Sequence, residues 1–183
     1  MDLSMLTLQF DQNALKDKNR FELLITDENE LSGLPESARD AAAMLAKSKD
    51  KNGWLFNLSA PSYIPFMRYS DKRDLREKMY REYMSVGNKG DEFDNKDIIK
   101  KIVNIRLEIA QLMGFKNYAE YALEHTMAKN SANVYKLLNQ LLEAYKPIAI
   151  NEYNAVEGFA LGTEKENITV MPWDWSCLLY TSP

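Results

Sequence analysis

The sequence predicts a mainly α-helical fold with one or two short β-strands. Along three long segments, apolar residues recur every three or four positions, as they do on one face of an amphipathic helix. Residue types that favour helix ends stand at the boundaries of these segments. Strand character is confined to two short runs, which are too few for an extended sheet.

The first third of the chain predicts one helix and one strand. Pro35-Glu36-Ser37 precedes an Ala-rich helix that extends through Ala46, and Asn52-Gly53 then turns the chain. The run from Trp54 to Leu58 has the apolar and aromatic composition of a short strand, and Pro61 closes it off. A run of similar character lies at 167–171.

Three apolar stripes predict helices that need partner surfaces, so three or more helices should pack together. Ser70 or Asp71 can cap the helix that contains Arg73 to Met84. Asp94 or Asn95 can do the same for the next helix. The stripes consist of Leu75, Met79, Tyr83 and Val86; of Ile98, Ile102, Ile105, Ile109 and Leu112; and of Val134, Leu137, Leu138, Leu141, Leu142 and Tyr145.

Further signals mark the ends of the last two long helices. Gly114 supplies a left-handed stop for the helix that begins near Ile98, and Asn117 begins a capping-box pattern just beyond it. Asn130 or Ser131 opens the last long helix. Within that helix, Pro147 is a candidate for a kink or an interruption.

Length and composition exclude several classes of protein. The 183 residues carry a formal charge of −4, which argues against a nucleic-acid-binding protein. No apolar run approaches the about 20 residues that span a bilayer, and the first residues show no signal-peptide pattern. Cys177 is the only cysteine, so neither an internal disulfide nor a multi-thiolate metal site can form.

His125 is the only histidine, and it lies in a partial metal motif. Tyr121 to His125 has the spacing of the inverted zinc motif H-x-x-E-H, with a tyrosine in place of the first histidine. Two ligands one helical turn apart must grip the metal together, and here one is missing. We therefore expect His125 to lie at a helix end, where it donates to a neighbour or faces water.

Three other groups of residues have both a structural and a functional interpretation. The aromatic and methionine residues from Tyr63 to Tyr83 can line a peptide groove, but their helical spacing favours a core. The charge run Asp71–Lys78 can dock a partner, but its alternating signs favour a solvated helix face with local ion pairs. Trp173-Asp174-Trp175 favours a structural knot that starts a helix, with Asp174 as the cap.

Several blocks of this sequence, taken together, resemble the zinc peptidase family of thimet oligopeptidase, oligopeptidase A and dipeptidyl carboxypeptidase. The resemblance is greatest to the bacterial dipeptidyl carboxypeptidase branch and runs from about Leu3 to Ser176. Any one block is weakly specific, whereas the ordered set is specific. The blocks are Leu31–Ser37, Ala60–Met67, Ser70–Tyr83, Asp94–Ile99, Leu112–Ala119 and Pro172–Trp175.

The resemblance implies a mostly helical enzyme in which a deep channel admits short peptides to one zinc ion. Two histidines of an H-E-x-x-H helix and a downstream glutamate bind the zinc in that family, and the motif glutamate is the general base. No H-E-x-x-H occurs in this chain, so no catalytic, cofactor-binding or metal-binding residue is carried over to it. We expect an internal segment that supplies helices of the channel wall and is itself inactive.

The resemblance also predicts how the segment is divided. Residues 1–69 should belong to an N-terminal helical region, 70–176 to the beginning of the peptidase domain without its catalytic helix, and 177–183 to an atypical tail with the character of a frame-change or assembly artefact. Zinc and short peptide substrates are expected for the full-length protein, in the cytoplasm and without nucleic-acid or membrane partners. This segment should bind no zinc, and its partner should be the missing remainder of its own chain.

Two expectations concern the chain by itself. If its apolar stripes pack on helices that it lacks, the isolated chain should be helical but loosely packed or prone to associate. The alternative is a self-contained helical module that binds a partner helix through an exposed stripe of methionine and aromatic residues, without catalysis. Endopeptidase and dipeptidyl carboxypeptidase activities both stay open.

Overall fold

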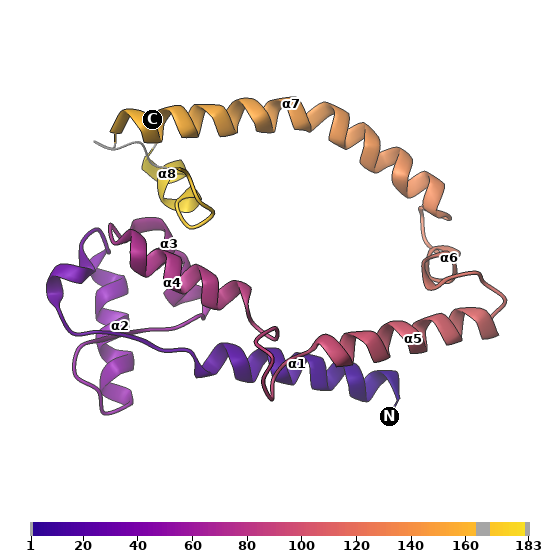
Figure 1. Ribbon diagram of the computed structural model, residues 1–183, viewed down its shortest axis with the longest axis horizontal. Coiled ribbons are helices and arrows are strands. Elements are labelled where there is room, and N and C mark those ends of the chain that lie inside the picture. The colour runs from indigo at the N-terminus through magenta and orange to yellow at the C-terminus, as the bar shows by residue number, and fades with distance from the viewer. Residues whose placement is uncertain (1, 164–168, 182–183) are drawn as a thin grey trace. The chain divides into compact units, whose positions relative to one another are not determined.

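The computed structural model describes residues 2–163 and 169–181 (Figure 1). Helices account for most of these residues, and two three-residue strands form the β-structure among them. The predicted mainly α fold with one or two short strands is therefore confirmed. The elements are α1 (Leu3–Arg20), β1 (Leu23–Ile25), the 3₁₀-helix η1 (Glu28–Leu31), α2 (Glu36–Ser48), β2 (Trp54–Phe56), α3 (Ala60–Tyr69), α4 (Arg73–Met84), α5 (Lys96–Leu112), α6 (Tyr118–Leu123), α7 (Ser131–Thr163) and α8 (Trp175–Thr181).

The chain forms two compact units. The first unit comprises Met1–Asp11 and Asn95–Ala155, and the second comprises Gln12–Asp94 and Val156–Pro183. Helices α1 and α7 each contribute residues to both units. The expected boundary between residues 69 and 70 concerns the domains of a longer peptidase and stays a prediction.

The second unit contains an antiparallel pair of strands. β1 pairs with β2, and Leu24 stands opposite Leu55 in the register. The predicted strand at 54–58 is present as Trp54–Phe56, but its partner β1 was not anticipated, because three residues are too short to show a period. Of the predicted strand at 167–171, residues 167 and 168 lie outside the described residues, and 169–171 do not form a strand.

Side chains from the strands, from α2 to α4 and from the turn before α8 form the core of the second unit. Phe66 and Met67 are buried within it, and the ring of Phe66 meets that of Phe56 edge to face, 4.8 Å between centroids. Burial of one such large apolar side chain contributes about 1.5–3 kcal/mol. Most of the aromatic and methionine residues that were predicted to form a core do so: Phe66 and Met67 are buried in it, and three tyrosines, Tyr63, Tyr69 and Tyr80, pack against it. Tyr83 is exposed. The buried core consists of Leu23, Ile25, Leu31, Leu34, Ala42, Phe56, Leu58, Phe66, Met67, Met79 and Trp173.

The first unit shows how the sequence ends one helix and begins the next. Gly114 has φ +85°, and the amide of Phe115 donates to the carbonyl of Ala110 at 2.8 Å, which closes α5 in a Schellman motif. Asn117 then caps α6 by accepting from the amide of Glu120 at 2.9 Å. Both predicted signals are confirmed.

Asn130 caps α7, as one of the two predicted alternatives, because its Oδ1 accepts from the amide of Asn133 at 2.9 Å. The helix then continues through Pro147 without the interruption for which that residue was a candidate.

Two other predicted caps are wrong. The residue before α4 is Lys72, which makes no side-chain cap. Ser70 Oγ accepts from the Lys72 amide at 3.3 Å, ahead of the helix, and Asp71 accepts from Ser32 Oγ. Asn95 precedes α5 without capping it, because its side chain donates to the carbonyl of Phe10 at 3.0 Å. Asp94 accepts instead from the amide of Gly90 in the preceding turn. Each of these side chains forms a bond outside its helix rather than a cap.

Among the helices of the described residues, none combines the length and the apolarity needed to cross a bilayer.

Candidate functional site

His125, the one histidine, lies on the surface beyond the end of α6. Its side chain is 90% exposed, and its Nε2 lies 3.6 Å from Glu124 Oε2. Within residues 2–163 and 169–181, no three His, Cys, Asp or Glu side chains are grouped so that they could hold a metal ion. The metal-donor side chains of the described residues therefore do not fit the zinc site that the resemblance implies for the full-length protein.

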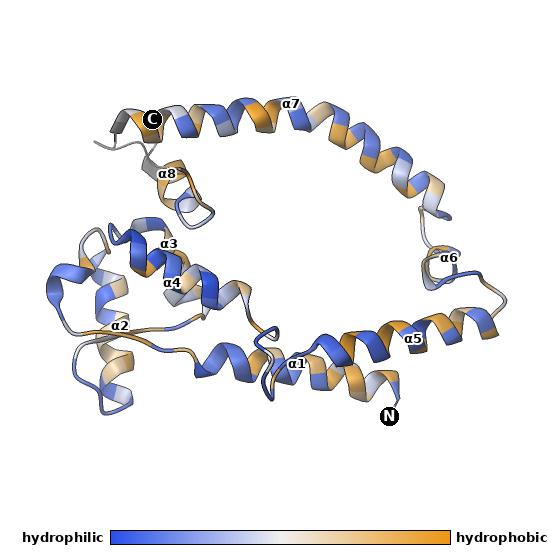
Figure 2. Ribbon diagram, in the orientation of Figure 1, coloured by the Kyte–Doolittle hydropathy of each residue, from blue (hydrophilic) through white to orange (hydrophobic). Residues whose placement is uncertain are grey.

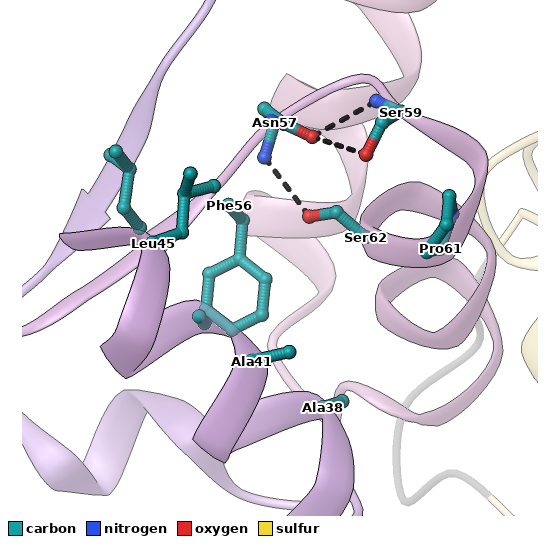
Figure 3. A pocket seen from close by; sticks show the side chains of 10 residues that line it. Ala38, Ala41, Leu45, Phe56, Asn57, Ser59, Pro61 and Ser62 are labelled. Carbon is teal, nitrogen blue, oxygen red and sulfur yellow. Dashed lines mark hydrogen bonds between the residues drawn. The ribbon is translucent and has the colours of Figure 1, made fainter. Parts of the chain in front are cut away.

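A small pocket lies between α2 and the segment that joins β2 to α3 (Figure 3). Its volume is about 130 Å³, and its walls are mainly alanine, leucine and Phe56 side chains. Asn57 Oδ1 accepts from the amide and the hydroxyl of Ser59, and Ser62 Oγ accepts from the Asn57 amide. The polar groups at its edge thus satisfy one another. The described residues that line it carry no titratable group, so it is not equipped for acid–base chemistry.

The most elaborate polar site joins α4 to the turn before α8, within the second unit. Asp174 is 2% exposed, and its carboxylate accepts hydrogen bonds from Arg73, from Arg76 and from the amide of Met171. The donor–acceptor distances lie between 2.8 and 3.1 Å. We call Asp174, Arg73 and Arg76 the Asp174 clasp.

The two arginines of the clasp also bind backbone carbonyls. Arg76 Nη1 donates to the carbonyl of Ser70 at 2.6 Å, and Arg76 Nε donates to that of Trp173 at 3.2 Å. Arg73 Nη2 donates to the carbonyl of Thr169 at 3.0 Å. The clasp therefore connects residues about 100 positions apart in sequence and holds the backbone on both sides of the connection.

Electrostatics keep Asp174 ionised in spite of its burial. Burial raises the pKa of a carboxyl, but the hydrogen bonds from Arg73, the Met171 amide and Arg76 outweigh it, so the pKa of Asp174 is lowered. The Arg76 side chain is only 8% exposed, and its charge is matched by this carboxylate. Such a carboxylate is a poor general base, and its role is to position the chain.

Trp173 packs beside the clasp. The ring of Tyr80 lies 6.0 Å from its ring, and the guanidinium of Arg81 lies 4.8 Å above it. Its buried Nε1–H has no hydrogen-bond partner among the described residues. The predicted structural knot is therefore present, and Trp173 is its apolar anchor. The carboxylate of Asp174, which was predicted to cap the next helix, accepts from the two arginines and from the Met171 amide.

A second contact joins the segment that follows η1 to the segment that follows α3. Ser32 Oγ donates to Asp71 Oδ2 at 2.5 Å, and the Asp71 amide donates to the Ser32 carbonyl at 3.0 Å. Gly33 has φ +82°, and a Cβ there would lie 2.1 Å from the Tyr69 carbonyl oxygen. Only glycine fits this approach. Residues from three blocks of the family resemblance, 31–37, 70–83 and 172–175, thus meet in the second unit.

The charge run Asp71–Lys78 was predicted to be a solvated face with local ion pairs, and this is wrong for its two arginines. Arg73 and Arg76 lie one helical turn apart and reach a carboxylate about 100 residues away. The available signal was the position of Arg76 three residues before Met79, on the face of α4 that the apolar stripe marks as buried. Glu77, at 37% side-chain exposure, does form the expected local pair with Arg81.

Comparison with known proteins places these residues in context. The model of a family described as Peptidase family M3 matches residues 66–179. The chain is 40% identical over 178 residues to "Oligopeptidase A" of Haemophilus influenzae, a match that includes 94% of this chain and 26% of that protein. It is 38% identical over 188 residues to "Probable cytosolic oligopeptidase A" of Arabidopsis thaliana, with 96% and 26% covered.

A third relative belongs to the branch that the sequence blocks had favoured. Identity to "Dipeptidyl carboxypeptidase" of Escherichia coli is 27% over 176 residues, with 96% of this chain and 26% of that protein covered. Identity is thus higher to the two oligopeptidase A sequences than to this dipeptidyl carboxypeptidase. The chain spans about a quarter of the length of these curated relatives.

Proposed function

Because this chain belongs to peptidase family M3, we propose that it is a scaffold segment of a zinc oligopeptidase that hydrolyses short peptides. The observation that carries the proposal is the continuous match of 94% of the chain to an oligopeptidase A, of which the match includes about a quarter. In such an enzyme the segment would form helices of the wall beside the catalytic centre. Endopeptidase and dipeptidyl carboxypeptidase activity remain alternatives for the full-length protein.

The residues of this chain would serve the enzyme by holding backbone in place. The Asp174 clasp fixes the path of the chain into α8, and the close approach of Gly33 to Tyr69 fixes the loop before α2. The zinc ligands and the general base would lie in the part of the enzyme outside these residues, since His125 is the one histidine of this chain and its side chain is exposed. The family match over 66–179 supports the assignment of 70–176 to the beginning of the peptidase domain. A cytoplasmic location remains part of the proposal.

A chimaera tests this proposal. The 178-residue segment of Haemophilus influenzae oligopeptidase A that this chain matches is replaced by the matching part of this chain, and cleavage of a fluorogenic oligopeptide is measured. We expect cleavage that a chelator abolishes and zinc restores. The 183-residue chain alone, with zinc, should show no cleavage. A chimaera that folds, as judged by circular dichroism, but has no activity would contradict the proposal, as would zinc-dependent cleavage by the chain alone.

The alternative of a self-contained interaction module is favoured by one observation, the exposed apolar side chains of α7. Limited proteolysis distinguishes the two functions. A module should leave a resistant core that includes α7, whereas a scaffold segment should be cleaved within the first 25 residues of that helix, 131–155, before the second unit is cleaved.

A further inference from the structure

Helix α7 exposes apolar side chains over most of the part that belongs to the first unit. Nine large apolar residues between positions 135 and 153 are 42–64% exposed. Figure 2 shows hydrophobic residues recurring along this helix between hydrophilic ones. The nine residues are Tyr135, Leu137, Leu138, Leu141, Leu142, Tyr145, Ile148, Ile150 and Tyr153.

Four of these residues lie in one series along a single face of the helix. Leu138, Leu142 and Tyr145 follow one another at spacings of four and three, and the same series continues through Ala149 and Tyr153 to Val156 and Ala160. We call this series the α7 apolar face. Val156 and Ala160, at its far end, are 5% and 0% exposed. The face is thus buried where it enters the second unit and exposed along 131–155, although its pattern is the same throughout.

The helix needs a packing partner along this exposed part. Helices in proteins derive most of their stability from packing of an apolar face rather than from intrinsic propensity. Pro147 lies inside α7, where a proline removes one backbone hydrogen bond and clashes with the preceding turn. A continuous helix through Pro147 therefore indicates that something packs against it in the working protein.

We propose that the α7 apolar face docks on the part of the M3 peptidase that lies outside these 183 residues; this inference rests on the proposed function. The partner is identified by the comparisons, because about three-quarters of each relative lies beyond the match and can supply helices to cover the face. The opposite side of α7 carries Lys136 and Glu143, one charge of each sign. A helix that binds a membrane surface instead has a polar face rich in Lys and Arg.

Binding to a gapped relative tests the proposal. Haemophilus influenzae oligopeptidase A lacking its matched 178-residue segment is prepared, and its affinity for the full 183-residue chain is measured. We expect binding by the unaltered chain. The double variant Leu138→Glu/Leu142→Glu should bind at least about 100-fold more weakly, because it places two charges on the face that docking would bury. The matched control, Gln140→Glu/Asn151→Glu, adds the same charge on the opposite side of the helix and should bind as the unaltered chain does.

Each other outcome has a defined meaning. Failure of the unaltered chain to bind, or equal binding by both double variants, overturns the proposal. Sedimentation of the chain alone is the second measurement: a dimer that only Leu138→Glu/Leu142→Glu dissociates identifies a second copy as the occupant and also overturns it. A complex that forms through the face but hydrolyses no peptide supports this inference while counting against the proposed function.

Discussion

Replacement of Asp174 by asparagine is the sharpest test of the Asp174 clasp. Asparagine preserves the size of the side chain but removes the charge that compensates Arg76, whose side chain is 8% exposed. Removal of one partner from a buried ion pair costs about 3–5 kcal/mol, because the other charge stays buried without compensation. Arg73 is 43% exposed and can turn toward water, so Arg73→Ala should cost only about 1–2 kcal/mol.

Tryptophan fluorescence during urea unfolding measures these effects in the second unit alone. All three tryptophans, Trp54, Trp173 and Trp175, lie in that unit. The control is Glu77→Gln, which breaks the exposed pair with Arg81 and should cost less than about 1 kcal/mol. We expect Asp174→Asn to lower the unfolding midpoint far more than this control or to abolish the transition. A loss below about 1 kcal/mol for Asp174→Asn would refute the assignment of the clasp as a buried, charge-matched connection.

Three more predictions concern the backbone, the pH dependence and the local stability. Gly33→Ala should destabilise the second unit by about 2–4 kcal/mol in the same urea assay, because at φ +82° a Cβ would lie 2.1 Å from the Tyr69 carbonyl oxygen. The control is Gly90→Ala, at φ +73° with open space around it, which should cost about 1 kcal/mol. The pKa of Asp174 is lowered in the folded chain, so the stabilisation by this carboxylate is complete above the unfolded carboxyl pKa of about 3.9 and is lost as the pH falls through the folded pKa. The urea concentration at the unfolding midpoint should therefore decrease when the pH is lowered below about 4, and it should decrease less in Asp174→Asn. In hydrogen exchange of the isolated chain, amides of 131–155 should exchange at least about tenfold faster than those of the two strands, and equal protection would contradict the exposure of this helix.

Local signals made the helices predictable. Gly114 in its left-handed conformation and Asn117 as a cap interact with residues only a few positions away. Both partners of each interaction therefore lie in one short stretch of sequence. The caps expected from Asp94 and Asn95 failed because these polar side chains found bonds outside the helix, in a turn and on the Phe10 carbonyl. A pattern of residue types cannot distinguish such alternatives, since the same polar side chain can bond to any of several backbone groups.

Long-range contacts were the part that the sequence did not reveal. The charges from Asp71 to Lys78 alternate as those of a solvated helix do, and the carboxylate that Arg76 binds lies about 100 positions away. In the same way, β1 has only three residues and becomes a strand by pairing with β2. Tertiary packing buries Arg76. A periodic pattern in the sequence indicates such burial for the apolar residues around Arg76, but not for the arginine itself.

The location of the resemblance has a physical explanation in this structure. Three of the blocks that carry it meet around Ser32, Asp71, Arg76 and Asp174, where a glycine approaches a carbonyl and a buried carboxylate binds two arginines. Each of these contacts tolerates few alternatives, because a larger residue clashes and a neutral one leaves a charge unmatched. A family-specific sequence pattern can therefore arise wholly from the requirements of folding. In this chain the pattern coincides with contacts that hold the backbone in place, and under the proposed function the zinc ligands would be supplied by residues outside this chain.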